Sequence, residues 1–307
     1  MALPDFKILP ARLMPIAAVF QFELQSLLKS WLVRLWLIAA ALTALLTVMV
    51  GWSVLPDAIL ISLLLAAFLV FPWFLVIIVL GVNASTAGRL DVAADGILSR
   101  PITRWQFLTG IWAARLLIVW AVSLAVLVPA VIAIVAGDRP QVVETQPITF
   151  FGLVASLAVV LVVLAFLVTV GVLLGTLFKN AWVAMIVLLF VWYPINAILV
   201  TFRLAEFSPI SLDQAMPSIL RKNWSEADES KAQAAGPLQA EVQRQAEEFI
   251  RTLTGTARPE RTHKGPEFYQ HDDKYKELSL AKVILSYGGF TILLWGLTVL
   301  IFYFRDL

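Results

Sequence analysis

The sequence predicts an all-α integral membrane protein with six transmembrane helices. Hydrophobic residues make up 60% of the 307 residues, charged residues only 14%, and the mean hydropathy is +0.87. This composition is far more apolar than that of a soluble domain. Six apolar runs are long enough to cross a bilayer, which takes roughly 20 residues. One longer polar segment, residues 204–282, precedes the last run.

Residues 1–30 are predicted to hold a short cytoplasmic segment and an amphipathic helix. Gln21, Gln25 and Lys29 recur at every fourth position. Apolar residues recur at helical spacing beside them, at Phe20, Leu24, Leu27, Leu28 and Trp31. This pattern favours a helix in the headgroup region of the membrane. The alternative is that the segment forms the first turns of the span that follows.

The six spans are expected in two blocks. Residues 31–203 hold five of them, joined by tight connections and by a polar loop, 83–110, and residues 283–307 hold the sixth with the C-terminus. The predicted spans are Trp31–Leu55, Ala58–Val82, Ile111–Ala136, Ile148–Phe178, Ala181–Phe202 and Val283–Phe304. An even number of spans places both termini on one side of the membrane.

The distribution of Lys and Arg predicts which side that is. With the amino end inside, nearly all Lys and Arg of the short loops are cytoplasmic, and Arg139 is the exception. Such an excess of positive charge marks the cytoplasmic side. We therefore expect a multi-pass protein of the plasma (inner) membrane with both termini in the cytoplasm.

The loop 83–110 is a polar island between the second and third spans. Its charged residues are Arg89, Asp91, Asp95, Arg100 and Arg104. Such a segment cannot lie in lipid, because its charges and its interrupted backbone need water or protein partners. We predict a cytoplasmic loop with a short helix on which another protein can press.

Residues 204–282 form an insert that is expected outside the cell. Pro237 and Gly255 are suited to the beginning and end of a helix. An apolar stripe on that helix includes Leu238, Val242, Phe249 and Leu253. The insert is therefore predicted to hold a helical hairpin, packed on itself, on a partner subunit or on the membrane surface. An envelope or substrate protein is a candidate occupant of the stripe.

Several classes of chemistry are disfavoured. The spans carry no ionisable residue at their centres, and Arg34, Arg115 and Lys282 lie near span ends, where long side chains reach the interface. A proton-driven transporter and an intramembrane protease therefore lack candidate residues. No G-x-x-x-x-G-K-[ST] loop occurs, so the chain is not expected to bind ATP in the P-loop manner, and energy for any work it does would come from another chain. No catalytic residue, metal site or cofactor is predicted, and a net charge of +2 does not suggest nucleic acid.

Polar residues within the spans are expected to form hydrogen bonds between helices. They are Ser123, Thr169, Thr176 and Asn196.

The segment 98–110, LSRPITRWQFLTG, resembles the region between spans two and three of ABC-2 type transporter permeases. The matching residues are Leu98, Ser99, Arg100, Pro101, Ile102, Thr103 and Arg104. The resemblance weakens after Gly110, where Ile111 replaces the usual Lys and Arg115 follows. Around Glu23, Leu27 and Lys29 the chain is similar to the amino-terminal interfacial helix of the family, and Phe207–Ile210 is similar to the segment after span five.

This resemblance implies a permease subunit that is not itself an enzyme. The loop would form a coupling helix, with Ser99–Trp105 docked on a dimer of cytoplasmic ABC ATPase subunits. A second permease half, identical or different, would complete the path for an exported substrate, surrounded by membrane lipid. The alternative is a membrane scaffold or sensor whose external insert binds an envelope protein.

Overall fold

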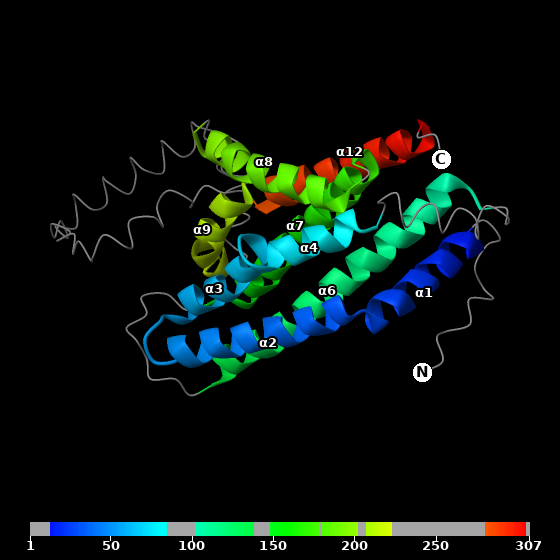
Figure 1. Cartoon of the computed structure of the whole chain (residues 1–307). Coiled ribbons are helices and arrows are strands. Elements are labelled where there is room, and N and C mark those ends of the chain that lie inside the picture. Colours follow the sequence, from blue (N-terminus) through cyan, green and yellow to red (C-terminus); the bar gives the residue numbers. More distant parts are fainter. Residues whose placement is uncertain are drawn as a thin grey trace, which may run out of the picture.

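The computed structural model describes residues 13–84, 102–137, 148–178, 180–201, 207–222 and 280–304. Within these ranges all regular secondary structure is helical, and most of the helices lie side by side in a bundle (Figure 1). The helices are α1 (Met14–Lys29), α2 (Trp31–Gly51), α3 (Asp57–Leu69), α4 (Trp73–Val82), α6 (Arg104–Ala136), α7 (Phe150–Leu177), α8 (Ala181–Thr201), α9 (Pro209–Leu220) and α12 (Leu280–Phe304).

Five segments are long and apolar enough to cross a membrane. They are Trp31–Gly51, Asp57–Val82, Arg104–Ala136, Phe150–Leu177 and Leu280–Phe304. Their positions agree with five of the six predicted spans, and the chain is a multi-pass helical membrane protein. At the predicted fifth span lies α8, whose apolar stretch Ala181–Asn196 is shorter. The count of six therefore stays a prediction.

The second span consists of two helices. The peptide bond between Phe71 and Pro72 is cis, and α3 and α4 lie on either side of it. A proline lacks the backbone N–H that would continue the hydrogen-bond ladder of α3. The sequence predicts one uninterrupted run, Ala58–Val82, without this break.

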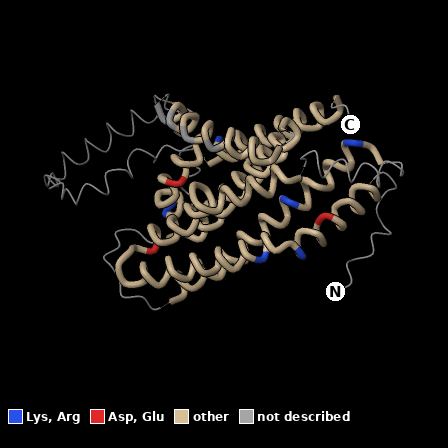
Figure 2. The backbone as a smooth tube through the Cα atoms, viewed as in Figure 1, with Lys and Arg blue, Asp and Glu red and all other residues tan. Residues whose placement is uncertain are grey.

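α7 lies at the centre of the bundle. It packs against α4, α6, α9 and α12, and Val159, Val163, Leu167 and Val168 on it are completely buried. Charged residues are sparse among the described residues, and long helical stretches carry none (Figure 2). The bundle is therefore held mainly by apolar packing, and each buried charge needs its own explanation.

The two ends of the bundle differ. The first turns of α1 and α6 and the last turn of α12 lie together at one end, on the right in Figure 1. We call this the Arg104 end. The turn between α2 and α3, the start of α7 and α9 lie at the opposite end, which we call the α9 end.

Candidate functional site

The candidate site is built around the start of α6, at the Arg104 end. Of the coupling residues predicted from the sequence, Ile102, Thr103, Arg104 and Trp105 are described, and Ser99, Arg100 and Pro101 lie outside the described residues. Thr103 is the N-cap of α6 and forms a capping box with Gln106. In it the Thr103 N–H donates to Gln106 Oε1 at 3.1 Å. The motif therefore sets the position at which α6 begins.

Arg104 and Trp105, the last two of the predicted coupling residues, belong to the same helix as the third span. The sequence predicts a short helix within the loop 83–110 and a separate span that begins at Ile111. Instead α6 runs without interruption from Arg104 to Ala136, over 33 residues. At 1.5 Å per residue this helix is about 50 Å long, whereas the hydrocarbon core is about 30 Å thick. The start of α6 is thus continuous with its membrane-spanning part.

Arg104 joins the start of α6 to the end of α12. Its Nη1 donates to the backbone carbonyl oxygen of Tyr303 at 2.9 Å. Carbonyls in the last turn of a helix lack partners within the helix, and a cation there is favoured by the helix dipole. Trp105, next in the chain, is 48% exposed, and Tyr303 and Phe304 are also exposed. The Arg104 end therefore presents an Arg–aromatic surface formed by two helices distant in sequence.

α1 packs along the first half of α6. A Cβ on Gly110 would lie 2.9 Å from Val19 Cβ and 3.0 Å from the Ile16 carbonyl oxygen, so only glycine lets the two helices come this close. The buried residues of α1 are Val19, Glu23 and Leu27. This face differs from the predicted apolar stripe, since Leu28 and Trp31 are exposed and the acidic Glu23 is buried.

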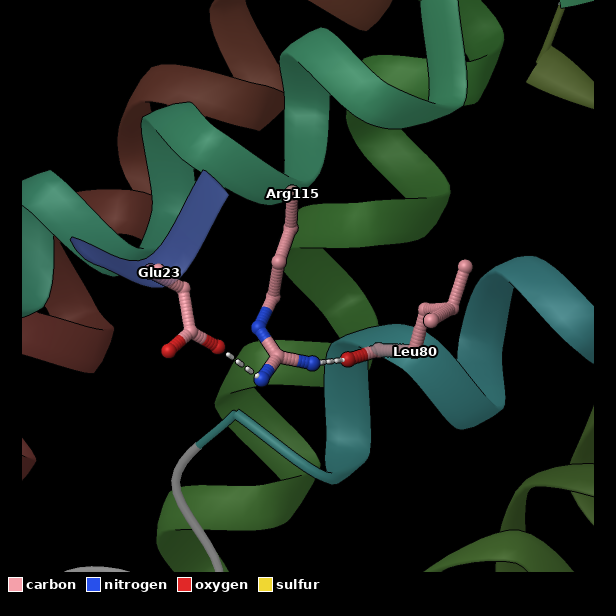
Figure 3. Close-up of polar contacts among 3 residues, drawn as sticks. All are labelled: Glu23, Leu80 and Arg115. Atoms are coloured by element: carbon pink, nitrogen blue, oxygen red, sulfur yellow. Dashed lines mark hydrogen bonds and ion pairs between the residues drawn. The ribbon is translucent and has the colours of Figure 1, made fainter. Parts of the chain in front are cut away.

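A buried ion pair lies where α1, α4 and α6 meet (Figure 3). The Nη2 of Arg115, which is 1% exposed, lies 2.6 Å from Oε1 of Glu23, which is 7% exposed. Nη1 of the same guanidinium donates to the Leu80 carbonyl oxygen. Leu80 is in the last turn of α4, where carbonyls have no helical partner. We call these three residues the Arg115 clamp.

Arg115 does not lie where the sequence predicts. The residue was expected to extend from a span end to the membrane interface, but its side chain points into the bundle and is buried. One sequence feature could have predicted this burial. Arg115 lies four residues inside the predicted span Ile111–Ala136, where a cation normally needs a partner within the protein. Glu23, the only acidic residue of α1, was the matching partner. Leu80 gave no signal, because a backbone carbonyl can belong to any residue type.

The part of α6 that follows the clamp is long and apolar enough to cross the membrane by itself. The run 116–136 contains no charged residue and is itself about 30 Å long, which is enough to cross the hydrocarbon core. The part of α6 from Arg104 to Arg115, against which α1 packs, is therefore not needed to cross that core. Removing one partner of a buried ion pair leaves an uncompensated charge, at a cost of about 3–5 kcal/mol. The three helices are accordingly tied to one another at the clamp.

Thr169 and Asn196, which are among the predicted polar residues, make hydrogen bonds to residues outside their own helices. Thr169 Oγ1 accepts from Trp112 Nε1 of α6 at 2.9 Å, and Asn196 Oδ1 accepts from the hydroxyl of Ser208, the N-cap of α9, at 2.7 Å. Thr176 donates to the Leu173 carbonyl oxygen of its own helix. Ser123 Oγ has no hydrogen-bond partner among the described residues.

At the opposite end, α9 is fastened to the start of α7. The Thr149 N–H donates to the Leu220 carbonyl oxygen at 3.1 Å, and its hydroxyl donates to the Lys222 carbonyl oxygen. The 12 residues of α9 are too few to span the membrane. Burial raises the pKa of Asp213 on this helix to about 7, because an enclosed carboxylate loses water. Its Oδ1 has no partner among the residues that the structure describes.

The other predicted site residues fall into two groups. Glu23 and Leu27 are buried against the bundle, and Lys29 is exposed in the last turn of α1. The external stripe lies outside the described residues, at Leu238, Val242, Phe249 and Leu253.

Comparison with known proteins identifies the family. The profile of the family described as "ABC-2 family transporter protein" matches residues 95–307, more than two thirds of the chain. No curated protein sequence matches it. The match covers part of the predicted coupling loop and every described helix from α6 to α12. It supports the transporter interpretation, and nothing favours the alternative of a scaffold or sensor. The chain therefore belongs to the ABC-2 transporter family, whose members are the non-catalytic membrane components of ABC transporters.

Proposed function

We propose that this chain is the permease subunit of an ATP-driven transporter that moves a substrate across the plasma membrane. A separate dimer of ABC ATPase subunits would supply the energy, and a second permease half, identical or different, would complete the path. Membership of the ABC-2 family supports the permease role. The absence of a P-loop motif from the sequence supports a separate ATPase.

In this proposal the Arg104 end is the cytoplasmic end, and the ATPase docks there. The cationic segment Ser99–Arg104 leads directly into α6. Arg100 and Arg104 are suited to charge-assisted hydrogen bonds with carboxylates of a partner. The exposed Trp105 adds an aromatic side chain, a residue type that is enriched in protein interfaces.

The observation that carries the proposal is the Arg115 clamp on the helix that begins with the coupling residues. A force that the ATPase exerts on the start of α6 would act on one continuous helix. The contacts of Arg115 with Glu23 and with the Leu80 carbonyl oxygen would transmit this force to α1 and to the end of α4. Three helices would therefore move together, and the second span would be displaced relative to its neighbours.

The proposal is tested by isolating the complex. The tagged chain is purified from its native membrane in mild detergent, and the proteins that accompany it are identified. We expect a P-loop ATPase to co-purify and its ATP hydrolysis rate to change when the permease is present in the same vesicles. Repeated purification without any such ATPase, under conditions that retain the folded permease, would contradict the proposal.

A second arm separates the clamp from general disturbance of α1. Glu23→Gln removes the charge that faces Arg115, whereas Gln25→Ala changes an exposed residue two positions away on the same helix. We expect Glu23→Gln to lower the effect of the permease on ATP hydrolysis and Gln25→Ala to leave it unchanged. Equal effects of the two variants would remove the clamp from the mechanism.

A further inference from the structure

The junction between α1 and α2 combines exposed cations with exposed apolar side chains. α1 ends at Lys29 and α2 begins at Trp31, because Ser30 between them has an extended backbone with ψ of 131°. Trp31 is 76% exposed and Leu28 is 54% exposed. Lys29 and Arg34, on either side of Trp31, are both exposed.

Within the described residues, no acidic side chain neutralises these two cations. The sequence contains no Asp or Glu between Glu23 and Asp57. The carboxylate of Glu23 is buried and paired with Arg115, and Asp57 follows α2, whose 21 residues span about 31 Å. Nε of Arg34 donates to the Leu28 carbonyl oxygen at 3.2 Å, a neutral group. The junction therefore has a net positive charge among the described residues.

The hydrogen bond to the Leu28 carbonyl oxygen also holds the Arg34 guanidinium against the last turn of α1. Lys29 follows Leu28 in the same turn. Arg34 marks the start of the uncharged run 35–56, which places the two cations where a helix enters the hydrocarbon core. At that depth the charged end of a Lys or Arg side chain reaches the lipid headgroups, while its aliphatic part lies along apolar surface.

We propose that the α1–α2 junction is a binding site for a phospholipid with a negatively charged headgroup. The negatively charged phosphate of the lipid, which no cation in the headgroup compensates, would be held by Lys29 and Arg34, and the acyl chains would cover Leu28 and Trp31. Charge complementarity selects an anionic lipid over a zwitterionic one, because each cation near an anionic headgroup surface strengthens attraction about fivefold. The bound lipid lies against α1, the helix that the Arg115 clamp ties to α6.

The test measures lipid retention by the full chain. Purified protein in detergent micelles is titrated with phosphatidylglycerol or with phosphatidylcholine, and retained lipid is counted by native mass spectrometry. We expect wild type to retain phosphatidylglycerol in preference to phosphatidylcholine. Lys29→Gln with Arg34→Gln should weaken phosphatidylglycerol retention roughly 25-fold, while Lys29→Arg with Arg34→Lys, which preserves both charges, should restore most of it.

Lys282→Gln is the matched control, since Lys282 is an exposed cation near the start of α12, at the end of that helix opposite Tyr303. It should change retention less than twofold. Unchanged helical circular dichroism shows that the double variant is folded. Equal phosphatidylglycerol retention by wild type and the folded double variant would overturn the proposal, and so would an equal loss in Lys282→Gln. Displacement of the lipid by inorganic phosphate at matched concentration would also overturn it, because the junction would then be a site for small anions.

Discussion

Gly81 of α4 and Gly171 of α7 face each other where their helices cross. A Cβ on Gly81 would lie 2.8 Å from Gly171 Cα and 2.9 Å from the Val168 carbonyl oxygen. Both neighbouring atoms are backbone, so neither can move aside as a side chain could. Small residues let transmembrane helices come this close, and close backbone packing replaces the hydrophobic effect that is missing in lipid. Gly81 lies next to Leu80, so this crossing also positions the carbonyl that Arg115 binds.

Gly81→Ala is expected to destabilise the bundle. The added methyl group must push α4 away from α7, and overpacking of this kind typically costs about 1–3 kcal/mol. Thermal unfolding of the purified protein in detergent measures the effect. Gly296→Ala on α12 is the control, because a Cβ there meets nothing within 4 Å. A fall in melting temperature that is equal in both variants would contradict the role of the crossing.

The topology prediction is tested with single cysteines. The chain contains no cysteine, so Ser99→Cys and Ser230→Cys each introduce a unique thiol. A membrane-impermeant maleimide should label Ser230→Cys in intact cells and Ser99→Cys only after the membrane is permeabilised. Labelling of Ser99→Cys in intact cells would place the coupling segment outside.

Charge reversal of the two arginines of the coupling motif should detach the ATPase. Arg100→Glu with Arg104→Glu turns attraction to an acidic surface into repulsion, which costs several kcal/mol at an interface. The variant should remain in the membrane but no longer co-purify with its ATPase. Lys282→Glu, a reversal outside the coupling segment, should leave co-purification intact. Normal ATPase recovery with the arginine variant would contradict the docking site.

The stability of the α9 region should depend on pH through Asp213. Burial raises the pKa of this carboxyl from 3.8 to about 7 in the folded chain. Between these values the folded state binds more protons than the unfolded state, so stability falls as pH rises. Asp213→Asn should remove this part of the dependence. Melting temperatures from about pH 5 to pH 8 measure it, and parallel profiles for wild type and variant would contradict the assignment.

The spans could be predicted because lipid imposes a simple rule on the sequence. An uncharged run such as 58–82 must be long enough to cross the hydrocarbon core, and run length can be read directly. The polar loop 83–110 could be predicted for a similar reason, since charged residues such as Arg100 and Arg104 are costly in lipid. Its role in coupling stays a prediction. The start of α6 was harder to predict, because nothing in the pattern near Gly110 shows whether one helix ends before another begins.

The Arg115 clamp could not be predicted from local patterns. Glu23 and Arg115 are 92 residues apart. The place of Arg115 inside a predicted span indicates that it needs a partner, but it does not show which residue supplies it. Their pairing depends on how α1 packs on α6, and that packing depends on Gly110. A glycine can occur at a position for many reasons, so the sequence does not show that this one lies at a helix contact. The break at Pro72 was missed because proline occurs within many transmembrane helices.

The central claim is that Glu23 and Arg115 act as one unit in transmitting ATPase contact into the bundle. A double-mutant cycle tests it, with Glu23→Gln, Arg115→Gln and the combined variant reconstituted with the ATPase that co-purifies with the chain. The measured quantity is the change in ATP hydrolysis rate that the permease causes. We predict that each single variant loses most of this change and that the combined variant loses no more than either single variant. If the fractional losses of the two single variants multiply in the combined variant, Glu23 and Arg115 act independently of each other. That result would contradict the account.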